Sequence, residues 1–146
     1  MENRPTVILL VEDDPDHVEL ILRALEEEHT AVDVYVVKDG QEALDYMYRR
    51  GKYGQENERS TPRLVLLDLR LPKLDGFEVL RRLKTDPKFK PIPVVILTTS
   101  LREDEVMKGY AEGANSYVTK PVEFDDFIQK VKDITRYWTL TNTLPV

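Results

Sequence analysis

The amino-acid sequence predicts an α/β fold, a doubly wound parallel sheet of five strands in the order 2-1-3-4-5, built from five βα units. Two observations lead to this prediction. Short apolar runs alternate along the chain with segments of helical periodicity, five times over, which is typical of a parallel sheet covered by helices on both faces. The length of 146 residues and the hydrophobic content of 41% suit one domain with a sizeable core.

The five apolar runs differ in character, and this difference predicts their places in the sheet. The runs at 6–11, 63–69 and 92–98 are apolar without alternation, as expected of strands that are buried on both faces. We therefore assign them to the centre of the sheet. The run at 32–37 alternates more, and the run at 116–119 is short and polar, so both are predicted at the edges.

Each apolar run is followed by a predicted helix with recognisable ends. The first helix, 15–28, begins with Asp14 as its N-cap and Pro15 as its first helical residue, a favoured pair at a helix start. The last helix begins near Phe124 and has the clearest apolar face. The other three helices, which end near a glycine or a proline, are predicted at 41–50, 76–85 and 103–112. A long polar loop is expected at 51–62.

Composition narrows the classes of function. The chain has 27 acidic and 21 basic residues and a formal net charge of -6, which disfavours electrostatic binding of nucleic acid or of an anionic membrane. It has no cysteine, so disulfides and thiolate metal sites are excluded. The N-terminal residues show no signal peptide, and no apolar run is long enough to span a bilayer. We therefore expect a cytoplasmic protein.

Acidic residues gather at one end of the predicted sheet. Glu12 and Asp13 directly follow the first strand, and Asp68 ends the third. In this strand order the first and third strands are neighbours, about 4.8 Å apart, and ligands bind beyond the carboxyl ends of strands at this point. Carboxylates held this close repel one another unless their pKa values rise, a cation binds or a lysine lies nearby. Lys120 follows the last strand at the same edge.

A hard divalent cation suits this group of carboxylates best. Mg²⁺ prefers oxygen ligands, keeps several waters and is commonly held by one or two carboxylates together with a substrate phosphate. The competing interpretation is that these acids are solvated loop residues or helix caps, which we accept for Asp14 and Asp16. For Glu12, Asp13 and Asp68, the local pattern alone leaves the two interpretations about even.

Four segments make the sequence resemble the receiver domain of bacterial-type response regulators, the phosphoacceptors of two-component signalling. The segments are LLVEDDPD, LVLLDLRLPKLDGFEVL, VVILTTS and GANSYVTKPVE, and they stand in the family's order and spacing over nearly the whole chain. The resemblance implies the flavodoxin-like receiver fold. It also implies a phosphoacceptor switch that is not an enzyme, with autophosphorylation from small donors and slow autodephosphorylation.

The resemblance assigns roles to individual residues. Asp68 would accept the phosphoryl group, and Lys120 and Thr98 would contact its oxygens. Thr98 and Tyr117 would form a switch that changes the face made by the fourth helix, the last strand and the last helix. The bond between Lys120 and Pro121 would be cis. The implied Mg²⁺ ligands are Glu12, Asp13, Asp68 and the backbone carbonyl of Arg70.

The C-terminal residues and two loop features indicate which partners to expect. Residues 1–136 are expected to form the receiver domain, and 137–146 a short extension without an effector domain. The enlarged loop after the second helix, the TTS after the fourth strand and the tail YWTLTNTLP resemble the single-domain regulators that partner phytochrome-type histidine kinases. We therefore expect a sensor histidine kinase, an unidentified downstream protein and a second copy of this chain as partners. The apolar residues of the tail, Trp138, Leu140 and Leu144, fit a fold-back onto the domain slightly better than an interface.

Three rival functions are weighed against the phosphoacceptor. A phosphatase of the haloacid-dehalogenase type needs a second acid two residues after its nucleophile, where this chain has Arg70. An FMN carrier needs a hydroxyl- and glycine-rich phosphate loop after the first strand, where this chain has EDDPD. A receiver-shaped scaffold that never sees phosphate stays open. The two histidines, His17 and His29, are expected at the surface, so neither is assigned a catalytic role.

Overall fold

The computed structural model describes residues 6–27, 32–54 and 61–143. Five parallel strands form one sheet in the order β2-β1-β3-β4-β5, which confirms the predicted topology. The strands are β1 (Thr6–Val11), β2 (Val32–Val37), β3 (Leu64–Leu67), β4 (Val94–Thr98) and β5 (Ser116–Thr119). The α-helices are α1 (Pro15–Glu27), α2 (Gly40–Tyr48), α3 (Gly76–Thr85), α4 (Glu103–Ala111) and α5 (Phe124–Arg136).

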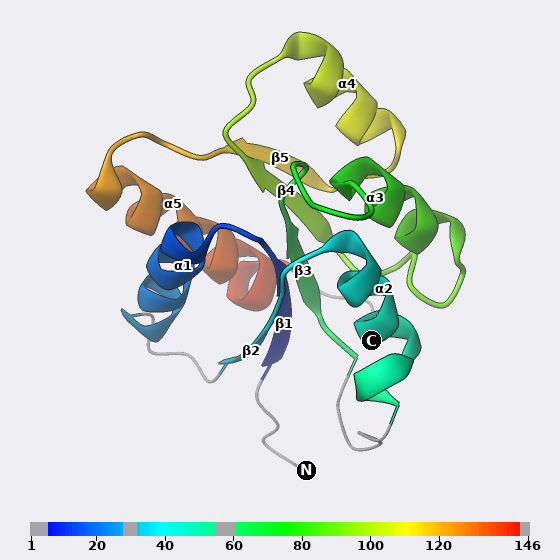
Figure 1. Ribbon diagram of the computed structural model, residues 1–146. Helices are drawn as coiled ribbons and strands as arrows, with labels where there is room; N and C mark the ends of the chain where they lie inside the picture. The colour runs from blue at the N-terminus through cyan, green and yellow to red at the C-terminus, as the bar shows by residue number, and fades with distance from the viewer. Residues whose placement is uncertain (1–5, 28–31, 55–60, 144–146) are drawn as a thin grey trace.

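The helices cover both faces of the sheet, with α1 and α5 on one side and α2 and α3 on the other (Figure 1). Side chains alternate along the strands between two apolar clusters. In β1, Leu9 and Val11 belong to the cluster with α2 and α3, whereas Ile8 and Leu10 belong to the cluster with α1 and α5. A strand that faces two cores is apolar at every position, which explains why the central runs do not alternate.

The edge positions predicted for the second and fifth strands are confirmed. β2 and β5 each pair with one neighbour only, β1 and β4 respectively.

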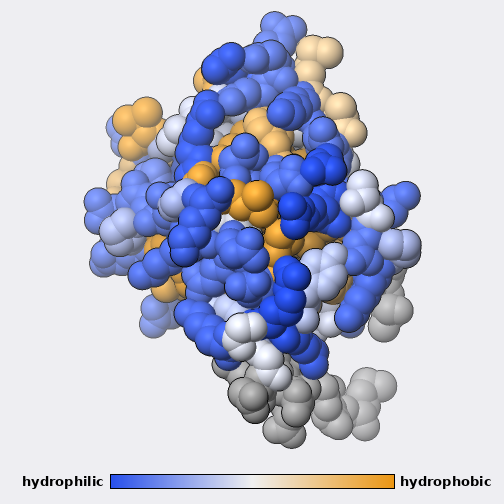
Figure 2. All heavy atoms as spheres, turned by 45° about the vertical axis from the view of Figure 1, so that its right-hand side comes forward, coloured by the Kyte–Doolittle hydropathy of each residue, from blue (hydrophilic) through white to orange (hydrophobic). Residues whose placement is uncertain are grey.

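The side of the molecule that carries α2, α3 and α4 is mostly hydrophilic, with hydrophobic side chains visible between the hydrophilic ones (Figure 2). Among the described residues, no helix has both the length and the apolar character needed to cross a membrane.

The helix ends lie within two residues of the predicted ones, and the largest difference is at the end of the second helix. Asp14 accepts hydrogen bonds from the backbone N–H groups of Asp16 at 2.9 Å and His17 at 3.4 Å, so it is the N-cap of α1 as expected. The second helix ends at Tyr48, before the predicted residue 50, because Arg49 takes a left-handed backbone conformation with φ 56°. A short 3₁₀ helix, Gly51–Tyr53, then begins the predicted long loop, of which residues 55–60 lie outside the described part.

Two further expectations concern the chain after β5. No cis peptide bond occurs among the described residues, so the expected cis bond between Lys120 and Pro121 is wrong; the trans isomer is the one that X–Pro bonds favour, by about 0.5–1 kcal/mol. After α5 the chain continues as a π-helical turn, Tyr137–Thr141. There Trp138 packs against the cluster of α1 and α5, as a fold-back requires, whereas Leu140 is 60% exposed. Leu144 lies outside the described residues.

Candidate functional site

The candidate site lies at the carboxyl edge of the sheet, and the strand register brings its residues together. Val11 of β1 is paired with Leu67 of β3, so Glu12 and Asp68 leave the sheet side by side. The backbone N–H of Asp68 still donates to the carbonyl of Val11 at 3.0 Å. At the other side, the N–H of Lys120 donates to the carbonyl of Thr98 at 2.7 Å. Strand pairing and these backbone hydrogen bonds therefore fix the Cα positions from which the side chains of the site project.

Three carboxylates converge at this edge, as the sequence predicts. Carboxylate oxygens of Glu12, Asp13 and Asp68 lie within 4.8 Å of one another. Glu12 and Asp68 are buried, with 1% and 7% of their surface exposed, whereas Asp13 is exposed. Burial, and next the neighbouring charge of Asp68, raise the pKa of Glu12 to about 7, although Lys120 acts in the opposite direction. The site is thus strongly attractive to a positive charge.

Lys120 supplies one such charge. Its side chain is 2% exposed, and its Nζ contacts a carboxylate oxygen of Glu12 and donates to Asp68 at 3.1 Å. A buried ammonium of this kind is tolerated because its three N–H donors are all used. The third contact is with Nδ1 of His17, at 2.8 Å.

The oxygen donors of the acidic group fit a hard divalent cation. Two of the carboxylates are held rigidly at the ends of buried strands, and the exposed Asp13 leaves the group accessible from solvent. Oxygen-only donor sets of this kind suit Mg²⁺ and Mn²⁺. Arg70 follows two residues after Asp68, and its backbone N–H donates to a carboxylate oxygen of Asp68 at 3.3 Å, so the loop after β3 is folded back onto the site.

Thr98 ends β4 beside this group and has an unusual environment. It is fully buried, and its hydroxyl has no hydrogen-bond partner in the part of the chain that the structure describes. Buried hydroxyl groups are nearly always paired, and leaving one unpaired costs about 1–3 kcal/mol. Thr98 ends β4 at the carboxyl edge where Asp68 and Lys120 also lie, so its hydroxyl is available to a ligand bound at this edge.

Tyr117, the expected switch aromatic, is not a simple surface residue. Its hydroxyl donates to the backbone carbonyl of Ser100 at 3.0 Å, in the loop between β4 and α4. Its backbone N–H, at the outer edge of the sheet, donates to the hydroxyl of Tyr110 on α4 at 3.2 Å. Partial burial raises the pKa of the Tyr117 hydroxyl. Tyr117 therefore ties β5 both to α4 and to the loop that follows Thr98.

His17 is the site residue that sequence reasoning missed. The expectation of a surface position is wrong, because its ring is partly buried, tilts against Phe127 at 5.6 Å between ring centroids and contacts Lys120. An ammonium can only donate, so Nδ1 of His17 accepts and the ring proton lies on Nε2, which is 3.6 Å from Asp14. The sequence places His17 three residues after the N-cap of α1, but no pattern in it predicts the contact with Lys120, which depends on how α1 packs against the sheet.

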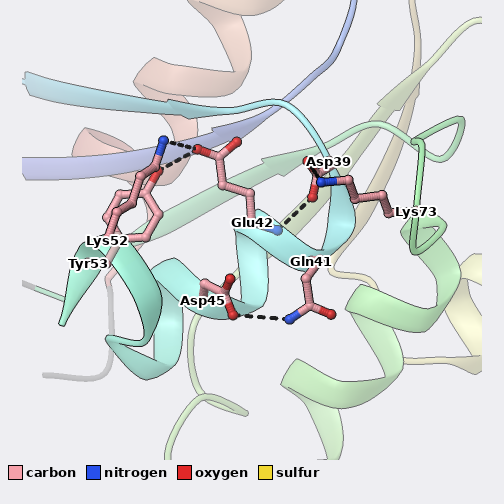
Figure 3. A pocket seen from close by; sticks show the side chains of 7 residues that line it. All are labelled: Asp39, Gln41, Glu42, Asp45, Lys52, Tyr53 and Lys73. Carbon is pink, nitrogen blue, oxygen red and sulfur yellow. Dashed lines mark hydrogen bonds and ion pairs between the residues drawn. The ribbon is translucent and has the colours of Figure 1, made fainter.

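A second place where charged groups gather is a pocket of about 390 Å³ beside α2 (Figure 3). Its charged groups are already paired with one another. Glu42 accepts from the Tyr53 hydroxyl at 2.6 Å and from Lys52 at 2.9 Å, and Asp39 caps α2 through the N–H of Glu42 and lies 3.6 Å from Lys73. These contacts hold the segment after α2 in place, and we assign no ligand to the pocket.

The comparison with known families identifies the fold and its site. Residues 8–132 match the response regulator receiver domain. The chain belongs to this family. Receiver domains are phosphoacceptor modules of two-component signalling that bind a divalent metal at an acidic pocket, and the carboxylates of the candidate site lie where that pocket is expected.

Individual members of the family are similar in sequence to this chain over most of their length. The chain is 43% identical, over 141 residues, to the probable methanogenesis regulatory protein FilR2 of Methanothrix harundinacea, covering 97% of this chain and 88% of that protein. It is 41% identical, over 143 residues, to the response regulator Rcp1 of Synechocystis, covering 98% and 95%.

Solved structures of receiver domains match equally well. The phosphorylated cyanobacterial phytochrome response regulator RcpA superposes with a TM-score of 0.92 at 42% identity, covering 98% of this chain and 100% of that one. The Mn²⁺-bound form of Rcp1 superposes with a TM-score of 0.90 at 39% identity, covering 97% and 100%. The relatives therefore include regulators associated with phytochromes.

Proposed function

We propose that this protein is a response regulator that accepts a phosphoryl group on Asp68 from a sensor histidine kinase, in a reaction that requires Mg²⁺. The observation that carries the proposal is the unpaired, fully buried hydroxyl of Thr98, a residue that ends β4 at the same edge of the sheet as Asp68. Asp68 and Lys120 lie 3.1 Å apart at the same edge. A carboxylate nucleophile, an ammonium and a free hydroxyl around one volume are the groups that a phosphoryl transfer needs.

The proposed chemistry follows from the donors at the site. An oxygen of Asp68 forms a bond to phosphorus as the bond between phosphorus and the donor histidine nitrogen breaks, and the histidine leaves with the electron pair. Mg²⁺, held by Glu12, Asp13, Asp68 and the backbone carbonyl of Arg70, would neutralise negative charge on the transferring group. Lys120 exchanges at least one of its three present partners for a phosphoryl oxygen, and the Thr98 hydroxyl donates to another.

The proposed output is a change of the face made by α4, β5 and α5. A phosphoryl group that engages the Thr98 hydroxyl alters the surroundings of the next loop residues, including Ser100, whose carbonyl holds the Tyr117 hydroxyl. Tyr117 in turn holds α4 through Tyr110. Phosphorylation then shifts an equilibrium between two arrangements by its different affinity for each.

The proposed partners rest on the relatives. One of the matching structures, RcpA, is a phytochrome response regulator, so we propose a phytochrome-type histidine kinase as the phosphodonor. We further propose that residues 1–136 act as the receiver, that 137–146 serve as an extension which contributes to a homodimer, and that the protein works in the cytoplasm. The proposal also includes a downstream protein that binds the face made by α4, β5 and α5.

The proposal is tested by intact mass after incubation with acetyl phosphate, with Mg²⁺ and with EDTA. Wild type should gain one phosphoryl group only with Mg²⁺, and Asp68→Asn should gain none. Asp16→Asn is the matched control, because Asp16 is exposed and lies outside the carboxylate group, and it should behave as wild type. No gain for wild type under any condition would favour the scaffold function instead.

A phosphatase of the haloacid-dehalogenase type receives no support from the geometry. The residue in the position of the general acid, Arg70, forms an ion pair with Glu105 at 2.9 Å, and a guanidinium in such a pair does not exchange protons near neutral pH. The carboxylates at this edge are better explained as cation ligands.

A further inference from the structure

We propose that Glu105 is a positioning residue which holds the side chain of Arg70 away from the phosphoacceptor, so that phosphoryl binding must first break the pair between these two residues. The inference rests on the proposed function, because it assumes that Asp68 carries the phosphoryl group. It adds to that function a residue on α4 that sets how tightly the group is held. Neither the sequence pattern nor the comparisons assign a role to Glu105.

The first observation is the burial and the partners of Glu105. It lies in the first turn of α4, and only 11% of its side chain is exposed. One carboxylate oxygen accepts from the guanidinium of Arg70 at 2.9 Å and is also contacted by the Ser100 hydroxyl. A single buried carboxylate therefore joins three segments, namely the loop after β3, the loop after β4, and α4.

The second observation is the position of Arg70. Its backbone N–H donates to Asp68, so the residue starts at the phosphoacceptor while its guanidinium reaches α4. The Arg70 side chain is 59% exposed, so it can change partners without leaving a buried space behind. A planar guanidinium binds the oxygens of both carboxylates and phosphoryl groups, often with two parallel hydrogen bonds.

These two observations create a competition for one guanidinium. A phosphoryl group on Asp68 adds negative charge two residues from Arg70, and the guanidinium then has two anionic partners to choose from. Removing Arg70 from Glu105 leaves a mostly buried carboxylate without its charged partner, which is costly. Phosphoryl affinity is therefore reduced, because the guanidinium must give up Glu105 before it can bind the phosphoryl group.

The competition also explains how the site would act on α4. Glu105 and the neighbouring Arg102–Asp104 pair are the charged contacts of the first turn of this helix, and the latter pair is exposed at both ends. One turn further on, Lys108 lies over the ring of Phe77 on α3, at 4.5 Å. When Arg70 leaves Glu105, the first turn of α4 is released from the loop after β3. The contact between Lys108 and Phe77 remains.

The test measures the affinity for beryllofluoride, a phosphoryl analogue, in the presence of Mg²⁺. Glu105→Gln keeps the acceptor for Ser100 but removes the charge that holds Arg70, and it should bind beryllofluoride three- to tenfold more tightly than wild type. Glu103→Gln is the matched control: it makes the same change in an exposed residue of the same turn, and its affinity should stay within twofold of wild type.

A double variant separates positioning from a general effect on the fold. In an Arg70→Met background there is no guanidinium to release, so Glu105→Gln should produce no further gain. An equal gain in both backgrounds, or a wild-type affinity in Glu105→Gln, would overturn the proposal while leaving the proposed function intact. A wild type that binds no beryllofluoride and takes no phosphoryl group would overturn both.

A second measurement needs no variant and so covers the case in which Glu105→Gln fails to fold. Hydrogen exchange of the wild-type protein should become faster in residues 103–108 when beryllofluoride and Mg²⁺ are added, because the first turn of α4 loses its link to the loop after β3. Slower or unchanged exchange in this turn would contradict the release of Glu105.

Discussion

At the scale of single residues, the site holds several charged side chains in largely buried positions. Lys120 compensates Glu12 and Asp68, which are 1% and 7% exposed. Breaking a buried ion pair by removing one partner leaves an uncompensated charge, whose cost is far above that of a surface pair. The balance of charge at this edge is therefore expected to control both stability and cation binding.

The first prediction concerns Lys120. Lys120→Met should lower the free energy of unfolding at pH 8 by roughly 3 kcal/mol in EDTA, because two buried carboxylates lose their cation. Saturating Mg²⁺ should recover much of this loss, since a bound cation supplies the charge instead. Urea unfolding in the two buffers measures both effects. Lys130→Met, which changes an exposed lysine, is the control, and an equal loss with and without Mg²⁺ would contradict the prediction.

The second prediction concerns the unpaired hydroxyl of Thr98. Thr98→Val keeps the shape of the side chain and removes a buried polar group without a partner, so it should raise the free energy of unfolding by about 1 kcal/mol. It should also weaken beryllofluoride binding by about tenfold or more. Thr135→Val is the matched control: its hydroxyl is also buried and unpaired among the described residues, but it lies on α5.

Thermal unfolding and titration with beryllofluoride distinguish the two threonines. Both variants should be stabilised, and only Thr98→Val should lose affinity for the phosphoryl analogue. A destabilised Thr98→Val would mean that the hydroxyl is paired in solution, and an unchanged affinity would remove Thr98 from the site.

The third prediction is a pH dependence that arises far from the site. Burial, and next the charge of Lys90, lower the pKa of Lys84 from 10.5 to about 8, and its Nζ donates to the carbonyls of Lys90 and Ile92 at 3.0 and 2.6 Å. Between pH 8 and 10.5 the unfolded chain binds more protons at Lys84 than the folded protein does. The contribution of Lys84 to stability therefore rises with pH across this window.

The measurement is the difference in the free energy of unfolding between wild type and Lys84→Met, by urea unfolding at pH 7 and pH 10. At the higher pH, wild type should gain stability relative to Lys84→Met by on the order of 1–2 kcal/mol. The gain is smaller than the full pKa shift would give, because the side chain is only partly buried. Lys130→Met should show no such trend. A difference that stays constant from pH 7 to 10 would mean that Lys84 titrates in the same range when folded and unfolded.

At the scale of elements, two helices each have a glycine at the point where they closely approach the sheet or the loop that follows it. A Cβ on Gly76, the first residue of α3, would lie 2.4 Å from the carbonyl oxygen of Asp68 and 2.7 Å from the Cα of Leu69. A Cβ on Gly109 of α4 would lie 2.8 Å from a methyl group of Ile96 and 3.2 Å from the ring of Tyr117. The first contact is with backbone, and the second is with the ends of side chains.

The fourth prediction compares these two glycines. Gly76→Ala should lower the free energy of unfolding by at least roughly 2 kcal/mol, because the backbone of Asp68 and Leu69, directly after β3, cannot shift easily. Gly109→Ala should cost less than about 1 kcal/mol, because side-chain ends can shift and alanine favours the helix by up to about 1 kcal/mol. Urea unfolding of both variants measures this difference, and equal losses would contradict the argument from the two contacts.

The elements were largely predictable from the sequence, because local rules determine them. Both edge strands, the strand order and the cap of α1 by Asp14 follow from apolar patterning and capping chemistry. The convergence of Glu12, Asp13 and Asp68 also follows, since each ends or follows a strand whose neighbour is set by the topology. The end of α2 does not follow, because the left-handed conformation of Arg49 is one that an arginine seldom adopts.

The contacts that the sequence did not predict are between side chains of different loops and helices. The contact of His17 with Lys120 joins residues 103 positions apart, and the pair of Arg70 with Glu105 joins residues 35 positions apart. A histidine on α1 and a glutamate on α4 are ordinary helix-surface residues. Only the packing of these two helices against the sheet brings His17 and Glu105 to the site. Such contacts depend on rotamers and loop paths that no periodicity in the sequence encodes.

At the scale of the whole molecule, charge and exposed apolar surface act in opposite directions. Each chain carries a formal net charge of -6, which makes two copies repel one another. Apolar side chains nevertheless remain exposed on α4 and after α5, among them Met107, Tyr110, Tyr137 and Leu140, at 67%, 52%, 49% and 60%. Exposed apolar residues that gather on one segment, as Tyr137 and Leu140 do after α5, are typical of an interaction site.

The fifth prediction is that two copies associate through the turn after α5, with a mass of twice 17.0 kDa in light scattering, with or without beryllofluoride. Leu140→Asp should shift the mass towards the monomer, because the change adds charge to the interface. Val122→Asp, in a fully exposed residue after β5, should not.

Raising the salt concentration from about 0.05 to 0.5 M should increase the dimer fraction, since salt screens the repulsion between the two negative chains but does not weaken apolar contacts. A monomeric mass in every condition, or dissociation by salt, would show that the exposed apolar residues serve another partner.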